Sequence, residues 1–299
     1  MKMQWHGVIP ALTTPFDEAL AVDHIALANH CRWMIDCGCT GVVALGSLGE
    51  GGALSLSEKA QMLKTCVQSL QGRAPVVAGV AALSTSEAVA IAKTAEDAGC
   101  SGLMVLPPYV YLGDWRETKA HVAAVLSATN LPAMLYNNPI AYKVDFVPEQ
   151  VHELVTKHPN LEAIKESSTD TRRVMALRVL MHPEFKILVG VDDGIVEALE
   201  MGAVGWIAGL VNAFPQESVD LFNLVLKGEK QKALDLYKWF LPLLRMDTVP
   251  KFVQLIKLAQ AEIGKGRALV RPPRLTLEGT ELAEARKTIA SALATRPNL

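Results

Sequence analysis

The chain has 299 residues, half of them apolar and about a fifth charged, with a formal net charge of −2. This length and composition are typical of one large domain, or of a domain with an appendage, that buries a sizeable core. The near-neutral balance and the lack of a long basic run exclude the electrostatic footprint of a nucleic-acid-binding protein and favour a small-molecule partner.

The N-terminal segment has neither a secretory nor a membrane-spanning pattern. Charge, glycine and proline interrupt residues 1–20 before an apolar region forms, and no uncharged apolar run of 18 residues follows. The number of cysteines is odd, and their spacing does not suggest a disulfide framework, which indicates a reducing compartment. We therefore expect a soluble, cytoplasmic protein with no membrane partner. The five cysteines are Cys31, Cys37, Cys39, Cys66 and Cys100.

The C-x-C pair, Cys37 and Cys39, raises the possibility of a metal site. No second pair of cysteines or histidines stands at zinc-site spacing, and "MIDCGCTGVV" is typical of a helix that ends before a strand. We interpret both residues as buried structural thiols, and we expect neither a metal ion nor another cofactor.

Eight short apolar runs rich in β-branched residues recur along the chain, each with the length of a buried strand. Most are separated by segments with helical periodicity, such as residues 23–38, 56–70 and 85–99. Two of these helical segments end in glycine, the residue preferred after a helix C-terminus. The predicted strands are residues 7–14, 41–46, 75–80, 102–107, 132–137, 161–166, 185–190 and 204–209.

Continuous apolar strands that alternate with amphipathic helices indicate parallel βαβ units whose strands are covered on both sides. Eight such units within residues 1–227 predict an α/β fold, a (β/α)8 or TIM barrel, with a doubly wound open sheet as the alternative. Residues 228–299 contain further helical patterns. We expect them to form a C-terminal helical extension and not a separate catalytic domain.

A barrel of this kind carries its chemistry at the carboxyl ends of its strands. Polar and reactive residues gather at these predicted ends. In chain order they are Gly46-Ser47-Leu48-Gly49-Glu50 after the second strand, Tyr109 beyond the fourth, Tyr136, Asn137 and Asn138 at the fifth, Lys165 at the sixth, and Asp192 and Asp193 after the seventh.

Lys165 stands in the apolar run "LEAIKE", where lysine is rare. Burial beside Ile164 disfavours the ammonium, so a neutral amine becomes accessible near pH 7. A neutral amine attacks a carbonyl or imine carbon and forms a Schiff base, which then withdraws electrons from the adjacent carbon. A structural ion pair with Glu166 or with another carboxylate is the alternative that this residue alone leaves open.

Tyr136, at the end of the neighbouring predicted strand, favours the catalytic interpretation. Its phenol can relay protons to and from a carbinolamine and substrate hydroxyls, which imine chemistry requires. The structural alternative is an amphipathic residue that closes the barrel mouth.

The glycine turn at residues 46–50 is the third element of the predicted site. Its glycines permit a tight turn whose N–H groups, with the Ser47 hydroxyl, can bind a carboxylate. It is not a Walker phosphate loop, because no Gly-Lys-Ser/Thr follows.

Together these residues resemble the dihydrodipicolinate synthase and N-acetylneuraminate lyase family of class I lyases. The resemblance rests on "GVIPALTTPF", "GSLGE", "LPPY", "YNNP", "IKESS" and "GVDDGIVEALEMGAVGWIAG", and the helical tail matches as well. It implies that Lys165 forms an imine with a 2-oxo or 2-imino acid while Tyr136 shuttles protons. It also implies a homotetramer built from two dimers. The implied substrate contacts are the Ser47 hydroxyl and Leu48 amide for the carboxylate, and backbone groups of Gly190 and Ile207 along the pocket.

Several positions depart from the family's biosynthetic pattern. Dihydrodipicolinate synthases usually have two threonines in the glycine turn, a second tyrosine in the proton relay, and an arginine five residues after the catalytic tyrosine. Here those positions are Ser47-Leu48, Val110 and Ala141. The missing relay tyrosine and arginine argue against lysine biosynthesis. Sialic acid lyases favour Ser-Thr in the turn, so Leu48 also argues against that activity.

"YNNP" and "GSLGE" together most resemble members that process 1-pyrroline-4-hydroxy-2-carboxylate, a hydroxyproline derivative. This substrate offers a C=N bond to Lys165, one carboxylate to Ser47, and a 4-hydroxyl that can leave after enamine formation. The expected products are 2-oxoglutarate semialdehyde and ammonia.

Two alternatives remain from other classes. A 2-keto-3-deoxy sugar acid aldolase or dehydratase would use the same Lys165 and Tyr136, with Asp192 or Asn138 contacting further hydroxyls. A catalytically silent barrel would bind a 2-oxo acid without forming an imine.

Overall fold

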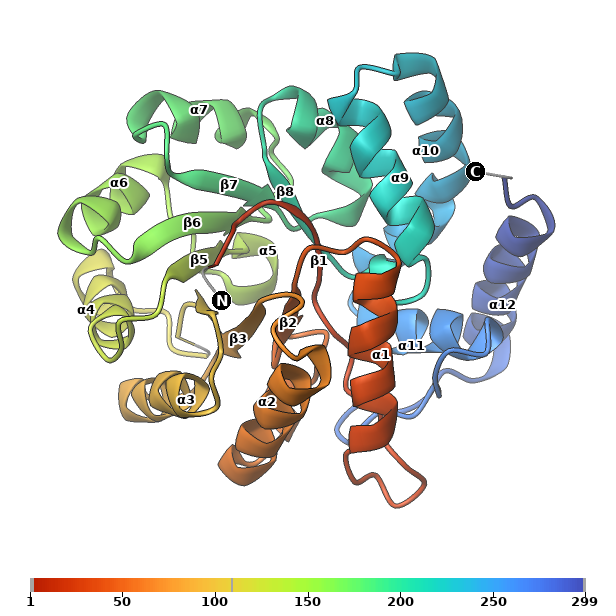
Figure 1. Ribbon diagram of the computed structural model, residues 1–299, viewed down its shortest axis with the longest axis horizontal. Coiled ribbons are helices and arrows are strands. Elements are labelled where there is room, and N and C mark those ends of the chain that lie inside the picture. Colours follow the sequence, from red (N-terminus) through yellow and green to blue (C-terminus); the bar gives the residue numbers. More distant parts are fainter. Residues whose placement is uncertain (1–2, 109, 298–299) are drawn as a thin grey trace.

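Eight parallel strands form one sheet in the order β1-β8-β7-β6-β5-β4-β3-β2 (Figure 1). The computed structural model describes residues 3–108 and 110–297. A parallel bridge between Ala11 and Val43 joins the first strand to the second, so the sheet closes on itself. The predicted (β/α)8 barrel is confirmed, and the open-sheet alternative is wrong. The strands are β1 (Gly7–Pro10), β2 (Val42–Ala44), β3 (Val76–Val80), β4 (Gly102–Val105), β5 (Ala133–Asn137), β6 (Leu161–Glu166), β7 (Lys186–Val189) and β8 (Gly205–Ala208).

The observed strands are shorter than most of the predicted apolar runs. The largest difference is in the first strand, expected over residues 7–14 but ending at Pro10. Beyond it, the Thr13 amide donates to the Asn212 side chain at 3.2 Å, and the Thr14 hydroxyl donates to the Gly49 carbonyl at 2.5 Å. These residues therefore leave the sheet and connect two loops at the barrel mouth.

Helices surround the strands, as Figure 1 shows. Several begin at a side chain that caps the first amide groups: Ser55 and Asp114 form reciprocal capping boxes with Glu58 and Glu117. The surrounding helices are α1 (His24–Asp36), α2 (Leu56–Leu70), α3 (Thr85–Asp97), α4 (Trp115–Leu126), α6 (Pro148–Lys157), α7 (Arg172–Leu180), α8 (Ile195–Glu200) and α9 (Pro215–Leu226), and the short α5 (Pro139–Tyr142) follows β5.

Alternation along the strands divides the core into two clusters, because successive strand residues point to opposite faces. On β6, Ile164 packs in the cluster between strands and helices, whereas Ala163 packs in the barrel interior. Lys165 shares the inward face of Ala163 and is only 6% exposed. On β5, Met134 and Tyr136 occupy the inward face in the same way. Both predicted catalytic side chains therefore enter the barrel at its carboxyl end.

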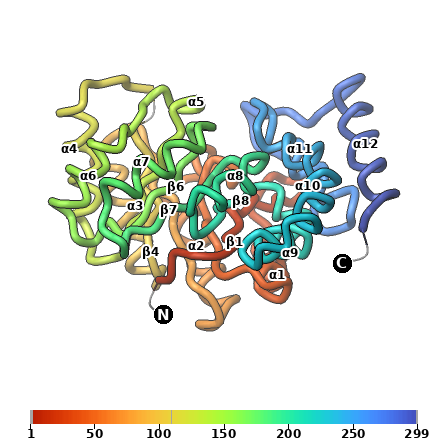
Figure 2. The backbone as a smooth tube through the Cα atoms, turned by 90° about the horizontal axis from the view of Figure 1, so that it is seen from above, coloured from red at the N-terminus to blue at the C-terminus, as the bar shows by residue number. Residues whose placement is uncertain are grey.

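The C-terminal helices, α10 (Lys230–Leu244), α11 (Phe252–Glu262) and α12 (Gly279–Ala294), gather on one side of the barrel (Figure 2). Helix α10 packs against α9, and α12 packs against α10 and α11. The single-turn helix η4 (Arg245–Asp247) joins α10 to the segment before α11. Within the described ranges, no helix combines the length and apolar character that crossing a bilayer requires.

Candidate active site

A cavity of about 770 Å³ opens at the carboxyl ends of the strands. The barrel topology brings residues from the ends of different strands to this one mouth. Seven of the eight predicted site residues line it: Ser47, Leu48, Tyr136, Asn138, Lys165, Gly190 and Ile207. Tyr109, which the sequence also placed at a strand end, lies outside the described residues.

Lys165 and Tyr136 are paired in register on adjacent strands, and the Lys165 Nζ lies 4.1 Å from the centre of the Tyr136 ring. Glu166 points the other way: its carboxylate accepts hydrogen bonds from the Asn137 side chain at 3.0 Å and from the Ser168 amide at 2.7 Å. In the described structure Lys165 forms an ion pair neither with Glu166 nor with another carboxylate, so the geometry gives the structural alternative no support. The lysine amine faces the cavity.

Gly190 makes room for the lysine side chain. A Cβ atom at this position would overlap both Lys165 Cε and the Ser167 hydroxyl. Any larger residue would therefore displace the amine from its place over the Tyr136 ring. This steric role accompanies the backbone contact expected of Gly190.

Asn138 holds the Tyr136 hydroxyl. Its side-chain amide donates to that oxygen at 3.1 Å, and its carbonyl oxygen accepts from the Ala141 amide at 3.0 Å. Asn138 is thus the N-cap of α5 and the orienting partner of Tyr136 at once. It was predicted as a substrate contact, and the observed geometry adds this positioning role.

The glycine turn carries Ser47 and Leu48 to the opposite side of the mouth from Lys165, because β2 and β6 lie across the barrel. The Ser47 hydroxyl is hydrogen-bonded to the Tyr142 hydroxyl. Sequence reasoning missed Tyr142 and treated Val110 as a lost hydroxyl. The only signal was a tyrosine six residues after Tyr136, on a helix too short to predict.

The profile of the Dihydrodipicolinate synthetase family matches residues 4–292, nearly the whole chain. The chain belongs to this family. It is 32% identical over 278 residues to the 4-hydroxy-tetrahydrodipicolinate synthase of Mesorhizobium japonicum, covering 93% of this chain and 95% of that protein. It is 34% identical over 279 residues to the enzyme of the same name from Agrobacterium fabrum, again covering 93% and 95%.

Two solved structures of the dihydrodipicolinate synthase family show the same fold. A putative dihydrodipicolinate synthetase from Pseudomonas aeruginosa matches with a TM-score of 0.91 and 29% identity, covering 97% of this chain and 100% of that one. A prophage protein of the family from E. coli, in complex with pyruvate, matches with a TM-score of 0.91 and 26% identity, covering 97% and 99%. The protein is a class I lyase of this family.

In this family member, a buried ion pair anchors the glycine turn to the C-terminal helices. Glu50 has a left-handed backbone, with φ of 53°. Its carboxylate is 2.6 Å from Lys257 Nζ on α11 and accepts from the Arg271 amide at 2.9 Å. The helical extension thus fixes the turn that presents Ser47.

Asp192 was expected to contact substrate hydroxyls, and the structure corrects this expectation. The residue is fully buried and does not line the cavity. Its carboxylate accepts hydrogen bonds from Trp206 Nε1 at 2.9 Å, from the Leu210 amide at 2.7 Å and from the Gly209 amide. Burial raises the pKa of Asp192 to about 6, against the opposing effect of these donors. Asp192 supports the loop after β8.

A different carboxyl group lines the cavity. Asp247, on η4, was missed because nothing local in "RMDTVP" distinguishes it from a surface turn. Burial and the nearby Asp192 raise the pKa of Asp247 well above its usual range, while the Lys165 ammonium acts in the opposite direction.

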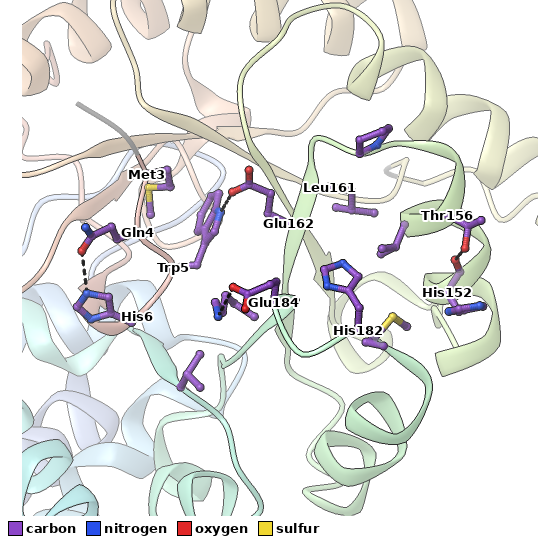
Figure 3. A pocket seen from close by; sticks show the side chains of 15 residues that line it. Met3, Gln4, Trp5, His6, His152, Thr156, Leu161, Glu162, His182 and Glu184 are labelled. Atoms are coloured by element: carbon purple, nitrogen blue, oxygen red, sulfur yellow. Dashed lines mark hydrogen bonds and ion pairs between the residues drawn. The ribbon is translucent and has the colours of Figure 1, made fainter.

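A second cavity, of about 870 Å³, lies at the amino ends of the strands (Figure 3). It contains the side chains of His152, His182 and Glu162, and Trp5 Nε1 donates to Glu162 at 3.0 Å. Its lysine, Lys186, is 36% exposed and 3.6 Å from a glutamate. A solvated, paired ammonium is a poor nucleophile, so this cavity offers no amine comparable to the buried Lys165.

Proposed function

We propose that the protein forms an imine between Lys165 and a small 2-oxo or cyclic 2-imino acid, and that its substrate is 1-pyrroline-4-hydroxy-2-carboxylate. The observation that carries the proposal is the buried amine of Lys165, 4.1 Å from the Tyr136 ring in a cavity whose far side presents Ser47 and Leu48. The pyruvate complex of the related E. coli protein supports a 2-oxo acid ligand.

The substrate carboxylate would bind the Ser47 hydroxyl and the Leu48 amide. Val110 and Ala141 stand where the biosynthetic pattern has a tyrosine and an arginine. A bidentate arginine supplies both charge and geometry for a second carboxylate, and alanine supplies neither. This substitution favours a substrate with one carboxylate.

In the proposed reaction, the neutral Lys165 amine adds to C2 and displaces the ring nitrogen, which becomes a primary amine on C5. Tyr136 removes a proton from C3, the 4-hydroxyl departs as water, and a C3=C4 double bond forms. A proton shift from C5 to C3, followed by tautomerisation, yields an imine at C5. Water releases ammonia from C5, and a second water releases the 2-oxo group from Lys165. The sum is substrate plus one water, giving 2-oxoglutarate semialdehyde and ammonia.

Borohydride trapping tests the covalent step. With pyruvate, reduction should add one adduct to the peptide that contains "AIKESS", and Lys165→Arg should show no adduct and no turnover, because guanidinium stays protonated. An adduct on another lysine would refute the assignment. No adduct on any lysine would favour the silent 2-oxo acid binder.

A substrate panel tests the reaction. We expect ammonia and the semialdehyde from 1-pyrroline-4-hydroxy-2-carboxylate, with the semialdehyde reported by a coupled dehydrogenase, and negligible condensation of pyruvate with aspartate semialdehyde. Robust condensation would refute the interpretation of Val110 and Ala141. Cleavage or dehydration of a keto-deoxy sugar acid, or cleavage of sialic acid, without activity on the pyrroline would assign the protein to that branch instead.

We also propose a homotetramer built from two dimers, on the basis of the family resemblance. Sedimentation velocity would test it: a single species of one or two subunits at micromolar concentration would contradict the tetramer.

A further inference from the structure

The proposed mechanism leaves one proton unassigned. Departure of the 4-hydroxyl as water requires an acid at that oxygen, because hydroxide is a poor leaving group. Tyr136 removes the proton from C3 in the same step, and its hydroxyl is held by Asn138 at 3.1 Å. The acid must therefore come from another group that lines the cavity.

The sheet order identifies the sector where that group should be. In the proposed complex, the substrate carboxylate binds the turn after β2 and its imine carbon is joined to Lys165 on β6. These two strands lie across the barrel, so the substrate spans the mouth. On the β5 side lie Tyr136 and Tyr142. On the β7 and β8 side, the lining includes Gly190, Val191, Ile207 and Gly209, none of which carries a polar side chain. This second sector leaves space for the substituents of the substrate.

Asp247 reaches into that sector from η4. A Cβ atom on Gly209 would overlap the Asp247 carboxyl group, so the glycine is what admits the carboxyl to the end of β8. Among the described residues the Asp247 side chain makes no hydrogen bond or ion pair. A cavity-lining carboxyl group without a partner is available to a ligand.

The surroundings of Asp247 also determine its protonation. Asp192 accepts hydrogen bonds from one indole and two backbone N–H groups, which stabilise its charged form. Asp247 is half-buried and has no such donors. Desolvation and the neighbouring Asp192 raise its pKa well above the usual range, against the opposing charge of Lys165. This difference in surroundings favours the protonated form at Asp247 over Asp192, and a general acid must be protonated to act.

From this placement we propose that Asp247 is the group that hydrogen-bonds the hydroxyl on the substrate chain and protonates it as it leaves. The inference rests on the proposed function. The C4–O bond breaks, its electron pair takes the Asp247 proton to form water, and the C3–H pair becomes the C3=C4 double bond. The resulting Asp247 carboxylate recovers a proton when water enters to release ammonia.

The first test separates imine formation from hydroxyl departure. Asp247→Asn should retain borohydride trapping of pyruvate and exchange of the pyruvate methyl protons in D₂O, each within about threefold, because neither involves a leaving hydroxyl. Ammonia release from the hydroxypyrroline acid should fall about 10²- to 10⁴-fold, the scale of a lost general acid. Equal losses in exchange and in ammonia release would overturn the proposal, as would unchanged ammonia release.

Asp193→Asn is the matched control. Asp193 precedes α8 on η2 (Asp192–Gly194), lies 3.5 Å from Arg245, and does not line the cavity. The Asp193→Asn substitution removes one carboxylate near Asp247 without changing a residue that lines the cavity. Ammonia release should therefore stay within about threefold of the wild-type rate. A loss as large as that of Asp247→Asn would assign the effect to the local charge and overturn the proposal.

A second measurement keeps the inference testable if wild-type protein does not act on the hydroxypyrroline acid. Two 2-oxo acids that differ by one hydroxyl, 4-hydroxy-2-oxobutanoate and 2-oxobutanoate, are compared by the concentration that half-saturates borohydride trapping. We expect wild-type protein to favour the hydroxylated acid about tenfold and Asp247→Ala to lose that preference. Equal preference in both proteins would overturn the role of Asp247 without reference to the natural substrate.

Discussion

Replacing Lys257 by methionine should destabilise the protein and loosen the glycine turn together. The Lys257 and Glu50 side chains are 2% and 0% exposed, and their charged atoms lie 2.6 Å apart. Methionine keeps much of the apolar stem that packs near Phe16, whose ring centre is 4.3 Å from the ammonium. The change therefore removes the charge and the hydrogen bonds with little loss of volume.

The expected cost follows from what remains around Glu50. Its carboxylate keeps the hydrogen bond from the Arg271 amide at 2.9 Å but loses its buried counter-ion. An uncompensated buried charge of this kind costs about 3–5 kcal/mol of unfolding free energy. The Leu269 carbonyl also loses its 2.6 Å partner, the Lys257 ammonium.

Urea unfolding followed by circular dichroism measures this cost, and Lys251→Met is the control. Lys251 pairs with Glu281 at the surface, with side chains 52% and 45% exposed, and such a pair contributes about 0–1 kcal/mol. The double variant Lys257→Met, Glu50→Gln should recover part of the loss, because a neutral amide no longer carries an unpaired charge.

The activity of the same variant tests the link to the site. Because Glu50 ends the turn that presents Ser47 and Leu48, half-saturation of pyruvate trapping should require a higher pyruvate concentration in Lys257→Met. A loss below 1 kcal/mol, or a double variant as unstable as Lys257→Met alone, would refute this account of the ion pair.

Three other expected outcomes concern the site and the core. Gly190→Ala should lower borohydride trapping at least tenfold with little change in urea midpoint, because the new methyl group displaces the Lys165 side chain; unchanged trapping would contradict the steric argument. Tyr136→Phe should lower kcat about 10²- to 10⁴-fold while pyruvate trapping persists, and near-normal kcat would assign the proton transfers to another group. Burial lowers the pKa of His30 below 6.5, so as pH falls through 6.5 the unfolded chain binds a proton that the native protein does not. That group's contribution to stability is present above pH 6.5 and should fall by up to about 1.4 kcal/mol per pH unit below it, a slope that His30→Gln should reduce in urea titrations.

The barrel and seven of the residues that line the cavity could be predicted from local sequence patterns. Strand and helix periods are local properties, and in a parallel barrel every strand delivers its last residues to the same mouth. Lys165 could therefore be assigned to the cavity from the six residues of its strand, and Tyr136 from the strand before it. The tight turn at residues 46–50 could be predicted because glycine permits the backbone conformations that such a turn requires.

The closed fold, in contrast, determines which polar groups line the cavity. Asp192 and Asp247 carry the same carboxyl group. The Asp192 carboxylate accepts hydrogen bonds from N–H groups of the loop after β8, whereas the Asp247 carboxyl group lies against Gly209 at the cavity. Glu50 meets Lys257 across 207 residues of chain, and Ser47 meets Tyr142 across 95. Such contacts depend on where helices outside the barrel return to its mouth and on the direction of single side chains. Local periodicity predicts which face of a helix or strand is buried. It does not predict which distant residue the closed fold places against that face.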